Sequence, residues 1–173
     1  MIGMAEDCEI EVRPICYETD LEAAASIWNE VVRDGVAFPQ DEELALETAR
    51  EFFDSQTAAG VAVEVGSGKV CGLYILHPNN VGRLASISNA SYAVASNMQG
   101  RHIGAKLVLD SIETAKREGF HALQFNAVVE SNASARHLYS KLGFEELGRV
   151  PSAFRRDDGT YENVYIYVYD LTK

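Results

Sequence analysis

A short glycine-containing turn, residues 96–106, holds the residue types best suited to bind an anion. Gly100 and Gly104 flank the expected start of a helix, where the first N–H groups have no intrahelical partner and the dipole favours negative charge. Small residues let a phosphate approach that backbone, and the turn adds three basic side chains: Arg101, His102 and Lys106. We therefore predict a phosphate site. The alternative is structural: Gly100 ends a turn and Gly104 packs the helix against a sheet.

Two better-known phosphate loops do not fit this segment. The chain contains no G-x-x-x-x-G-K-[ST], and no G-x-G-x-x-G closes the first strand of a βαβ unit. Chemistry on nucleoside triphosphates or dinucleotides therefore loses support. The formal net charge of −11 also repels a phosphate backbone, so we expect no nucleic-acid partner. An anion site on such a protein has to be built locally, from N–H groups and a few basic side chains.

The elements that position this turn follow from hydrophobic periodicity and turn residues. Strands are expected at 9–13, 60–65, 70–76, 85–94, 122–129, 145–150 and 164–171, and helices at 20–34, 41–53, 100–118 and 132–142. Residues 9–13 alternate as an edge strand does, whereas 122–129 carry few charges, which predicts a central strand. The order β-α-α-β-β-β-α-β-α-β-β indicates a single α/β domain, residues 1–173, built on one mixed sheet.

Composition excludes several other classes. No apolar stretch is long enough to span a membrane, and residues 1–7 lack the basic and apolar regions of a secretory signal. Three cysteines without C-x-x-C spacing indicate reduced thiols, and the histidines have no metal-ligand spacing. We therefore expect a cytoplasmic protein with no membrane partner and no metal.

Two ordered segments resemble the acetyl-CoA-binding core of the GNAT acetyltransferase superfamily. The turn matches the pattern [Q/R]-x-x-G-x-[G/A] at Gln99, Ile103 and Gly104. It departs at His102, where the family usually has glycine. Residues 132–144, NASARHLYSKLGF, match N-x-x-A-x-x-L-Y-x-x-L-G-F almost position for position. The resemblance implies a mostly antiparallel sheet that is splayed between its fourth and fifth strands and flanked by helices.

The same resemblance implies acetyl-CoA as co-substrate, with its pantetheine arm in the gap between those strands. The residues implied to contact it are Tyr92, Ala93 and Val94 on a strand, Gln99, Gly100, Arg101, His102, Ile103, Gly104 and Ala105 around the pyrophosphate, and Asn132 and Ala135 opposite. Tyr139 would stand near the thioester sulfur and protonate the departing thiolate, as a positioned phenol can. The alternative for Tyr139 is plain packing beside Leu138 and Leu142.

Two asparagines are candidates for holding the amine that accepts the acetyl group. Asn89 and Asn126 lie on the two strands of the expected splay, although asparagine is depleted in strands. A bulge or a local side-chain-to-backbone bond is the alternative. Residues 125–132 and 148–151 resemble the fungal acetyltransferases that act on azetidine-2-carboxylate and other proline analogues, in which asparagines orient the substrate. No general base is assigned: Glu30 and Glu64 are more typical of solvated surface charges, and ordered water is the alternative route for the proton of the amine.

Several functions stay open at this point. The resemblance favours N-acetylation of a small-molecule amine such as an amino acid or its analogue, by direct attack in a ternary complex. A polyamine, an antibiotic amine or a protein or peptide N-terminus is a possible acceptor as well. From other classes, His102 and the missing strand carboxylate suggest a non-catalytic acyl-CoA-binding module, and a structural partner-binding domain is the third reading. Tyr165, Tyr167 and Tyr169 form a stripe suited to a helix or to a homodimer partner.

Overall fold

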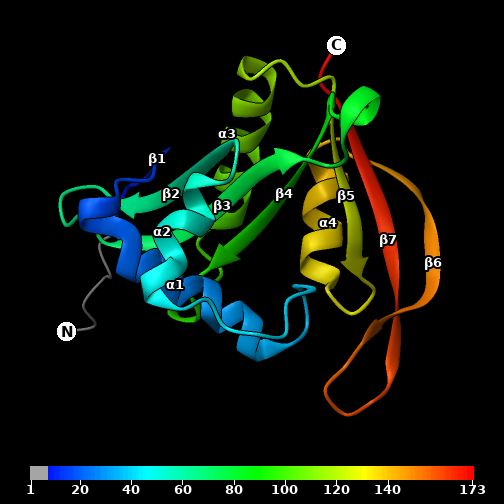
Figure 1. The fold of residues 1–173 in the computed structure, drawn as a ribbon, viewed down its shortest axis with the longest axis horizontal. Helices are drawn as coiled ribbons and strands as arrows, with labels where there is room; N and C mark the ends of the chain where they lie inside the picture. The colour runs from blue at the N-terminus through cyan, green and yellow to red at the C-terminus, as the bar shows by residue number, and fades with distance from the viewer. Residues whose placement is uncertain (1–7) are drawn as a thin grey trace, which may run out of the picture.

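One seven-stranded sheet organises the computed structural model, which describes residues 8–173 (Figure 1). The absence of a secretory signal was inferred from residues 1–7, which lie outside the described residues. In chain order the elements are β1 (Ile10–Pro14), α1 (Tyr17–Asp34), α2 (Leu46–Asp54), β2 (Ala58–Glu64), β3 (Val70–Pro78), the short 3-10 helix η1 (Gly82–Leu84), β4 (Ile87–Val94), the 3-10 helix η2 (Ser96–Met98), α3 (Ile103–Arg117), β5 (Ala122–Val129), α4 (Ala133–Lys141), β6 (Glu145–Arg155) and β7 (Tyr161–Asp170). The predicted order of strands and helices is confirmed.

The sheet is splayed at one junction. Its strand order is β1-β2-β3-β4-β5-β7-β6, and every neighbouring pair is antiparallel except β4 and β5. Those two strands pair only at Ile87 with Ala122 and at Ser88 with Leu123. Beyond this point they diverge, as Figure 1 shows. A mixed, mostly antiparallel sheet that opens between its fourth and fifth strands is therefore confirmed, with β1 at an edge and β5 inside.

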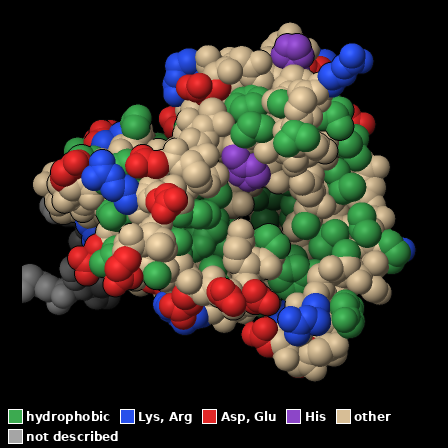
Figure 2. All heavy atoms as spheres, in the orientation of Figure 1, with side chains coloured by type: hydrophobic (Ala, Val, Ile, Leu, Met, Phe, Trp, Pro, Cys, Tyr) green, Lys and Arg blue, Asp and Glu red, His purple; other side chains and the backbone are tan. Residues whose placement is uncertain are grey.

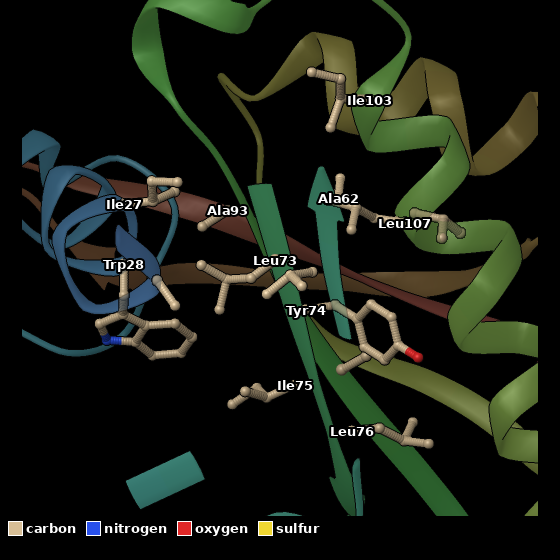
Figure 3. Close-up of a cluster of buried hydrophobic side chains, with 14 of the residues drawn as sticks. Ile27, Trp28, Ala62, Leu73, Tyr74, Ile75, Leu76, Ala93, Ile103 and Leu107 are labelled. Carbon is tan, nitrogen blue, oxygen red and sulfur yellow. The ribbon is translucent and has the colours of Figure 1, made fainter. Parts of the chain in front are cut away.

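Helices cover both faces of the sheet because its strands carry apolar residues on both sides. On one face, Leu73, Ile75 and Ala93 point toward Trp28 of α1, as the close-up shows (Figure 3). On the other face, Tyr74 donates to Asp110 of α3 over 2.7 Å. We call these the α1 face and the α3 face. Helix α4 lies beside α3, where Leu138 comes within 3.7 Å of the position of a Cβ on Gly104.

The two N-terminal helices begin elsewhere than the sequence predicts. Helix α1 starts at Tyr17. The carboxylate of Asp20, in its first turn, accepts a hydrogen bond from the Cys16 N–H (2.8 Å) and forms an ion pair with Arg13 (2.6 Å). Helix α2 starts at Leu46 instead of near residue 41, because 36–45 form an irregular connection fixed by Asn29, whose amide bonds both the N–H and the carbonyl of Leu44.

The tyrosine stripe on β7 is covered by the chain itself and does not lie on an open surface that a second copy could bind. Strand β7 lies between β5 and β6, so β6 forms the edge of the sheet. Tyr167 is buried against Tyr139 of α4, with ring centroids 5.7 Å apart. The stripe therefore packs on a helix of its own chain, which leaves the homodimer a prediction without that support. Among the described residues, no helix has both the length and the apolar character that crossing a bilayer requires.

Candidate active site

A cavity of about 350 Å³ lies where β4 and β5 separate. Figure 2, in the orientation of Figure 1, shows a recess with hydrophobic walls at this place. The cavity is lined by Ala37, Phe38 and Pro39 from the α1–α2 connection, by residues 89–92 of β4, by 125–129 of β5, and by Asn132, Ala135 and Tyr139 of α4. Because α1 and α4 lie on opposite faces of the sheet, the cavity passes through it. This is possible because β4 and β5 make no ladder hydrogen bonds at this level.

Tyr139 contributes the hydroxyl best placed for chemistry in this cavity. Its ring is nine-tenths buried among aromatic side chains, and its centroid lies 4.5 Å from that of Phe125. Within the described residues its hydroxyl has no hydrogen-bond partner, so it faces the cavity. Burial, and then the nearby Tyr167, raise the pKa of Tyr139 above its ordinary value. The phenol is therefore protonated throughout the neutral range and available as a donor.

The first turn of α3 is open in the way the sequence predicts. His102 is the N-cap residue, and its side chain makes no capping hydrogen bond to any described residue. The first backbone bond into the helix comes from the Lys106 N–H to the His102 carbonyl, over 3.3 Å. Within the described residues, the N–H groups of Ile103, Gly104 and Ala105 therefore have no acceptor. Three aligned donors at the positive end of a 15-residue helix form a site for an anion.

The basic side chains of this turn point elsewhere. Arg101 pairs with Glu64 of β2 at 3.2 Å, and Lys106 donates to the carbonyl of Ile10 at 3.1 Å. Both cations hold the turn against the sheet here, and their contribution of positive charge to the phosphate site stays a prediction. The Arg101 backbone remains part of the turn, and the exposed His102 is the remaining basic group there.

The strand edges and the start of α4 supply the other predicted contacts. Past Ser88 the edge of β4 that faces β5 has no ladder partner, which leaves the backbone of residues 92–94 available. The Tyr92 hydroxyl bonds Ser111 of α3 at 2.7 Å and does not enter the cavity as a free donor. Asn132 caps α4 by accepting the Ala135 N–H at 3.3 Å, so its oxygen is engaged, although both residues line the cavity.

The two candidate asparagines both line the cavity. Asn89 is half-buried, and Asn126 sits where the β5–β7 register shifts, so the bulge considered as an alternative is present. The structure brings two further amides to Asn126 that the sequence did not single out. Gln124 donates to its Oδ1 at 3.0 Å, and Asn79 forms a reciprocal amide pair with it. Gln124 lies two residues away on the same strand, whereas Asn79 is 47 residues distant and gave no sequence signal.

Comparison with known proteins decides the family. Residues 24–144 match the acetyltransferase (GNAT) family. The chain belongs to this family. A solved GCN5-related N-acetyltransferase from Kribbella flavida is 35% identical and has a TM-score of 0.84, covering 93% of this chain and 97% of that one.

Two curated relatives carry named activities. N-acetyltransferase aca1 of Schizosaccharomyces pombe is 26% identical over 82% of this chain and 75% of its own length. An L-methionine sulfoximine/L-methionine sulfone acetyltransferase of Pseudomonas aeruginosa is 27% identical over 76% and 78%. The protein is accordingly an acetyl-CoA-dependent N-acetyltransferase, whereas its likeness to the fungal proline-analogue enzymes stays a prediction.

The backbone at His102 shows why glycine is usual at this position. His102 has φ +58°, in the left-handed region that glycine adopts without steric cost and that strains other residues. The family's usual glycine thus meets a backbone requirement, and this chain meets it with a strained histidine whose backbone still opens the turn. The turn keeps its shape, so the histidine is no evidence for a non-catalytic module.

The cavity contains no charged base. Its lining has neither a carboxylate nor an imidazole. Glu64 accepts from Arg101 and Ser67, and Glu30 accepts the Ser96 N–H at 2.9 Å, which ties α1 to the loop after β4. Both glutamates therefore have structural partners. No cluster of possible metal ligands occurs among the described residues.

Proposed function

We propose that this GNAT enzyme transfers the acetyl group of acetyl-CoA to the amine of a small molecule, an amino acid or a close analogue, by direct attack in a ternary complex. The observation that carries the proposal is the through-sheet cavity, which brings the Tyr139 hydroxyl together with the amides of Asn89 and Asn126. The open first turn of α3 follows β4, one wall of this cavity, along the chain. The two substrates would reach the cavity from opposite faces, the cofactor from the α3 face and the amine from the α1 face.

The size of the cavity supports a small acceptor. A volume of about 350 Å³ lies at the lower end of the range for small-molecule sites, roughly 300–1,000 Å³. Phe38, which is 7% exposed, and Pro39 form part of its wall on the α1 face. A recess of this size accommodates a side chain or an amino acid and not a folded protein surface. The Pseudomonas relative is named for two amino acid derivatives, which agrees with this acceptor class.

Binding of the cofactor would use the backbone more than side-chain charge. The N–H groups of residues 103–105 would hold the diphosphate, and the free edge of β4 would pair with the amides of the pantetheine arm as an added strand does. A backbone N–H near Val94 would stabilise the negative charge that develops on the thioester oxygen. The turn and the strand edge fit these groups because no side chain or strand of residues 8–173 occupies either one.

Tyr139 would act on the leaving sulfur. Amine attack releases CoA as a thiolate, and the buried phenol would donate a hydrogen bond to that sulfur. Burial keeps this hydroxyl protonated, and the same dry surroundings destabilise the leaving thiolate, which favours passing the proton to the sulfur. The proton of the attacking amine would leave through water, because the cavity offers no charged base.

Thiol release tests this function. The purified enzyme is mixed with acetyl-CoA and with L-methionine sulfone, a set of α-amino acids, spermidine and a peptide with a free N-terminus. We expect release of CoA thiol with an amino acid and not with the peptide. Turnover on the peptide alone would contradict a small-molecule acceptor.

Substitution of Tyr139 tests the mechanism separately. Tyr139→Phe removes only the hydroxyl and should lower kcat by roughly 10²–10⁴-fold, with the KM for acetyl-CoA within about threefold. Tyr161→Phe, which alters a 60% exposed tyrosine, is the matched control and should keep full activity. An unchanged kcat in Tyr139→Phe would remove this residue from the chemistry.

A further inference from the structure

Four amide side chains gather beside the apex of the splay: those of Asn79, Asn89, Gln124 and Asn126. Asn89 and Ala93 share a face of β4 because they are four residues apart, and Ala93 points toward α1 in Figure 3. Across the parallel pairing, Ser88 aligns with Leu123, which brings Gln124 level with Asn89. On β5, Phe125 packs against Tyr139 on the α3 face, so Gln124 and Asn126 project from the α1 face.

The exposed amide of Asn126 makes three hydrogen bonds to neighbouring amides. Its Oδ1 accepts two hydrogen bonds, from Gln124 Nε2 at 3.0 Å and from Asn79 Nδ2 at 3.2 Å. Its Nδ2 donates one hydrogen to Asn79 Oδ1 at 2.5 Å. A carboxamide oxygen has two lone pairs and the nitrogen has two hydrogens, so the oxygen is fully used and one N–H is left. Within the described residues that N–H has no acceptor, and Asn126 lines the cavity.

Asn79 is itself tied to the sheet through its backbone. Its backbone N–H donates to the Ile87 carbonyl at 2.7 Å, which joins the end of β3 to the start of β4. A reciprocal amide pair then connects this corner to β5, so Asn79 spans the two strands where the sheet opens. Rotating the Asn126 amide alone by half a turn would break all three of its bonds, so Asn79 and Gln124 set its orientation relative to their own amides.

We propose that Asn79 and Gln124 are positioning residues that turn Asn126 so that it offers an N–H to the acceptor molecule. That N–H fits an oxygen, which on an α-amino acid is the α-carboxylate. Asn89 has no side-chain partner within the described residues and lies beside the same cavity, so its amide supplies a second donor for the other oxygen. The inference rests on the proposed function, and it names the chemical group by which this site selects its amine.

The absence of charge in the cavity agrees with this role. The lining residues contain no Lys or Arg that could pair with a carboxylate, and the whole chain carries −11. Neutral donors, which are the amides and the hydroxyls of Ser91 and Tyr139, are therefore the side-chain groups of the lining that can bind an anionic oxygen. Hydrogen bonds to charged groups contribute about 1.5–3 kcal/mol, which corresponds to roughly 10- to 150-fold in kcat/KM.

A pair of acceptors isolates the carboxylate. L-methionine sulfone and 3-(methylsulfonyl)propylamine differ only by that group, and both are assayed with the wild-type enzyme and with Asn126→Ala. We expect kcat/KM for the amino acid to fall about 10- to 100-fold, mostly through KM, and kcat/KM for the amine to change less than about threefold. Equal losses on both acceptors would overturn the inference. An enzyme active only on the amine would overturn it while leaving acetyl transfer intact, whereas no turnover on these two acceptors or on any α-amino acid of the panel would refute both.

A double-mutant cycle shows whether the two outer amides act through Asn126. Asn79→Ala and Gln124→Met should each raise the KM for the amino acid about three- to tenfold with kcat unchanged, and each should have less than a twofold effect when added to Asn126→Ala. Asn80→Ser, in the same loop, keeps an oxygen for the Val81 N–H and serves as the control. Additive losses on the Asn126→Ala background, or losses in kcat alone, would contradict a positioning role.

Discussion

Replacing Ala105 by proline probes the anion site of α3 without damaging the helix. Ala105 is the third residue of α3, and the first backbone bond into the helix is made by the following residue, Lys106. A proline there removes one free N–H and no intrahelical hydrogen bond, as is usual in a first turn. The residue before it is Gly104, which has no Cβ to clash with the proline ring. The helix should therefore keep its geometry.

The expected loss follows from a single charge-assisted hydrogen bond. Such a bond contributes about 1.5–3 kcal/mol, so Ala105→Pro should weaken binding of CoA roughly 10- to 150-fold. Isothermal titration calorimetry with CoA measures this directly. Thermal unfolding of the free protein checks the fold, and the Tm should stay within a few degrees of that of the parent.

A truncated cofactor shows where the loss arises. S-acetylpantetheine lacks the diphosphate, so its kcat/KM should change less than about twofold in Ala105→Pro, while that of acetyl-CoA falls. Gly104→Ala, whose new Cβ would lie 3.7 Å from Leu138, keeps every N–H and is the control. Equal losses with both thioesters, or undiminished CoA binding, would refute the assignment of these amides to the diphosphate.

Three further predictions concern stability. His102→Gly relieves a left-handed φ of +58° and should leave the Tm unchanged or higher. The β-branched His102→Val should lower the free energy of unfolding by about 1–2 kcal/mol. Calorimetry that ranks the two variants in the reverse order would refute the strain at this residue. Gly72→Ala would place a Cβ 2.9 Å from the Ala93 carbonyl and should cost about 1–3 kcal/mol, against less than about 0.5 kcal/mol for the unobstructed Gly148→Ala, as measured by urea unfolding. Burial alone would raise the pKa of Asp20, but the hydrogen bonds from Arg13 and the Cys16 N–H outweigh it and lower that pKa. Asp20→Asn should therefore cost about 1.5–3 kcal/mol at pH 7, a difference that shrinks as the pH falls below about 4 and protonates the parent carboxyl; a constant difference down to pH 2 would show that the charge is irrelevant.

Local signals in the sequence were enough for most elements. Glycines at 66 and 68 adopt positive φ in the predicted hairpin turn, and β5 spans residues 122–129 as its apolar run predicts. The free first turn of α3 could also be predicted, because a helix start needs no distant partner to leave its N–H groups open. The splay itself came only from the family resemblance, since nothing local shows where a ladder of hydrogen bonds ends.

Features that depend on distant contacts could not be predicted. The side chain of Arg101 was expected at the phosphate but pairs with Glu64, 37 residues away. Helix α1 begins early because Asp20 is held by Arg13 from β1. The partner of Asn126, Asn79, becomes visible only when β3 and β5 are brought together on either side of β4. In each case the direction of a polar side chain is set by the tertiary neighbour and not by its own segment.

A crystal structure of the enzyme with acetyl-CoA tests the central claim most directly. The diphosphate should lie on the N–H groups of residues 103–105, the pantetheine arm should run along the free edge of β4, and the thioester sulfur should be within hydrogen-bonding distance of the Tyr139 hydroxyl. Cofactor bound elsewhere, with β4 and β5 paired beyond Ser88 and the first turn of α3 filled by the chain's own side chains, would contradict it.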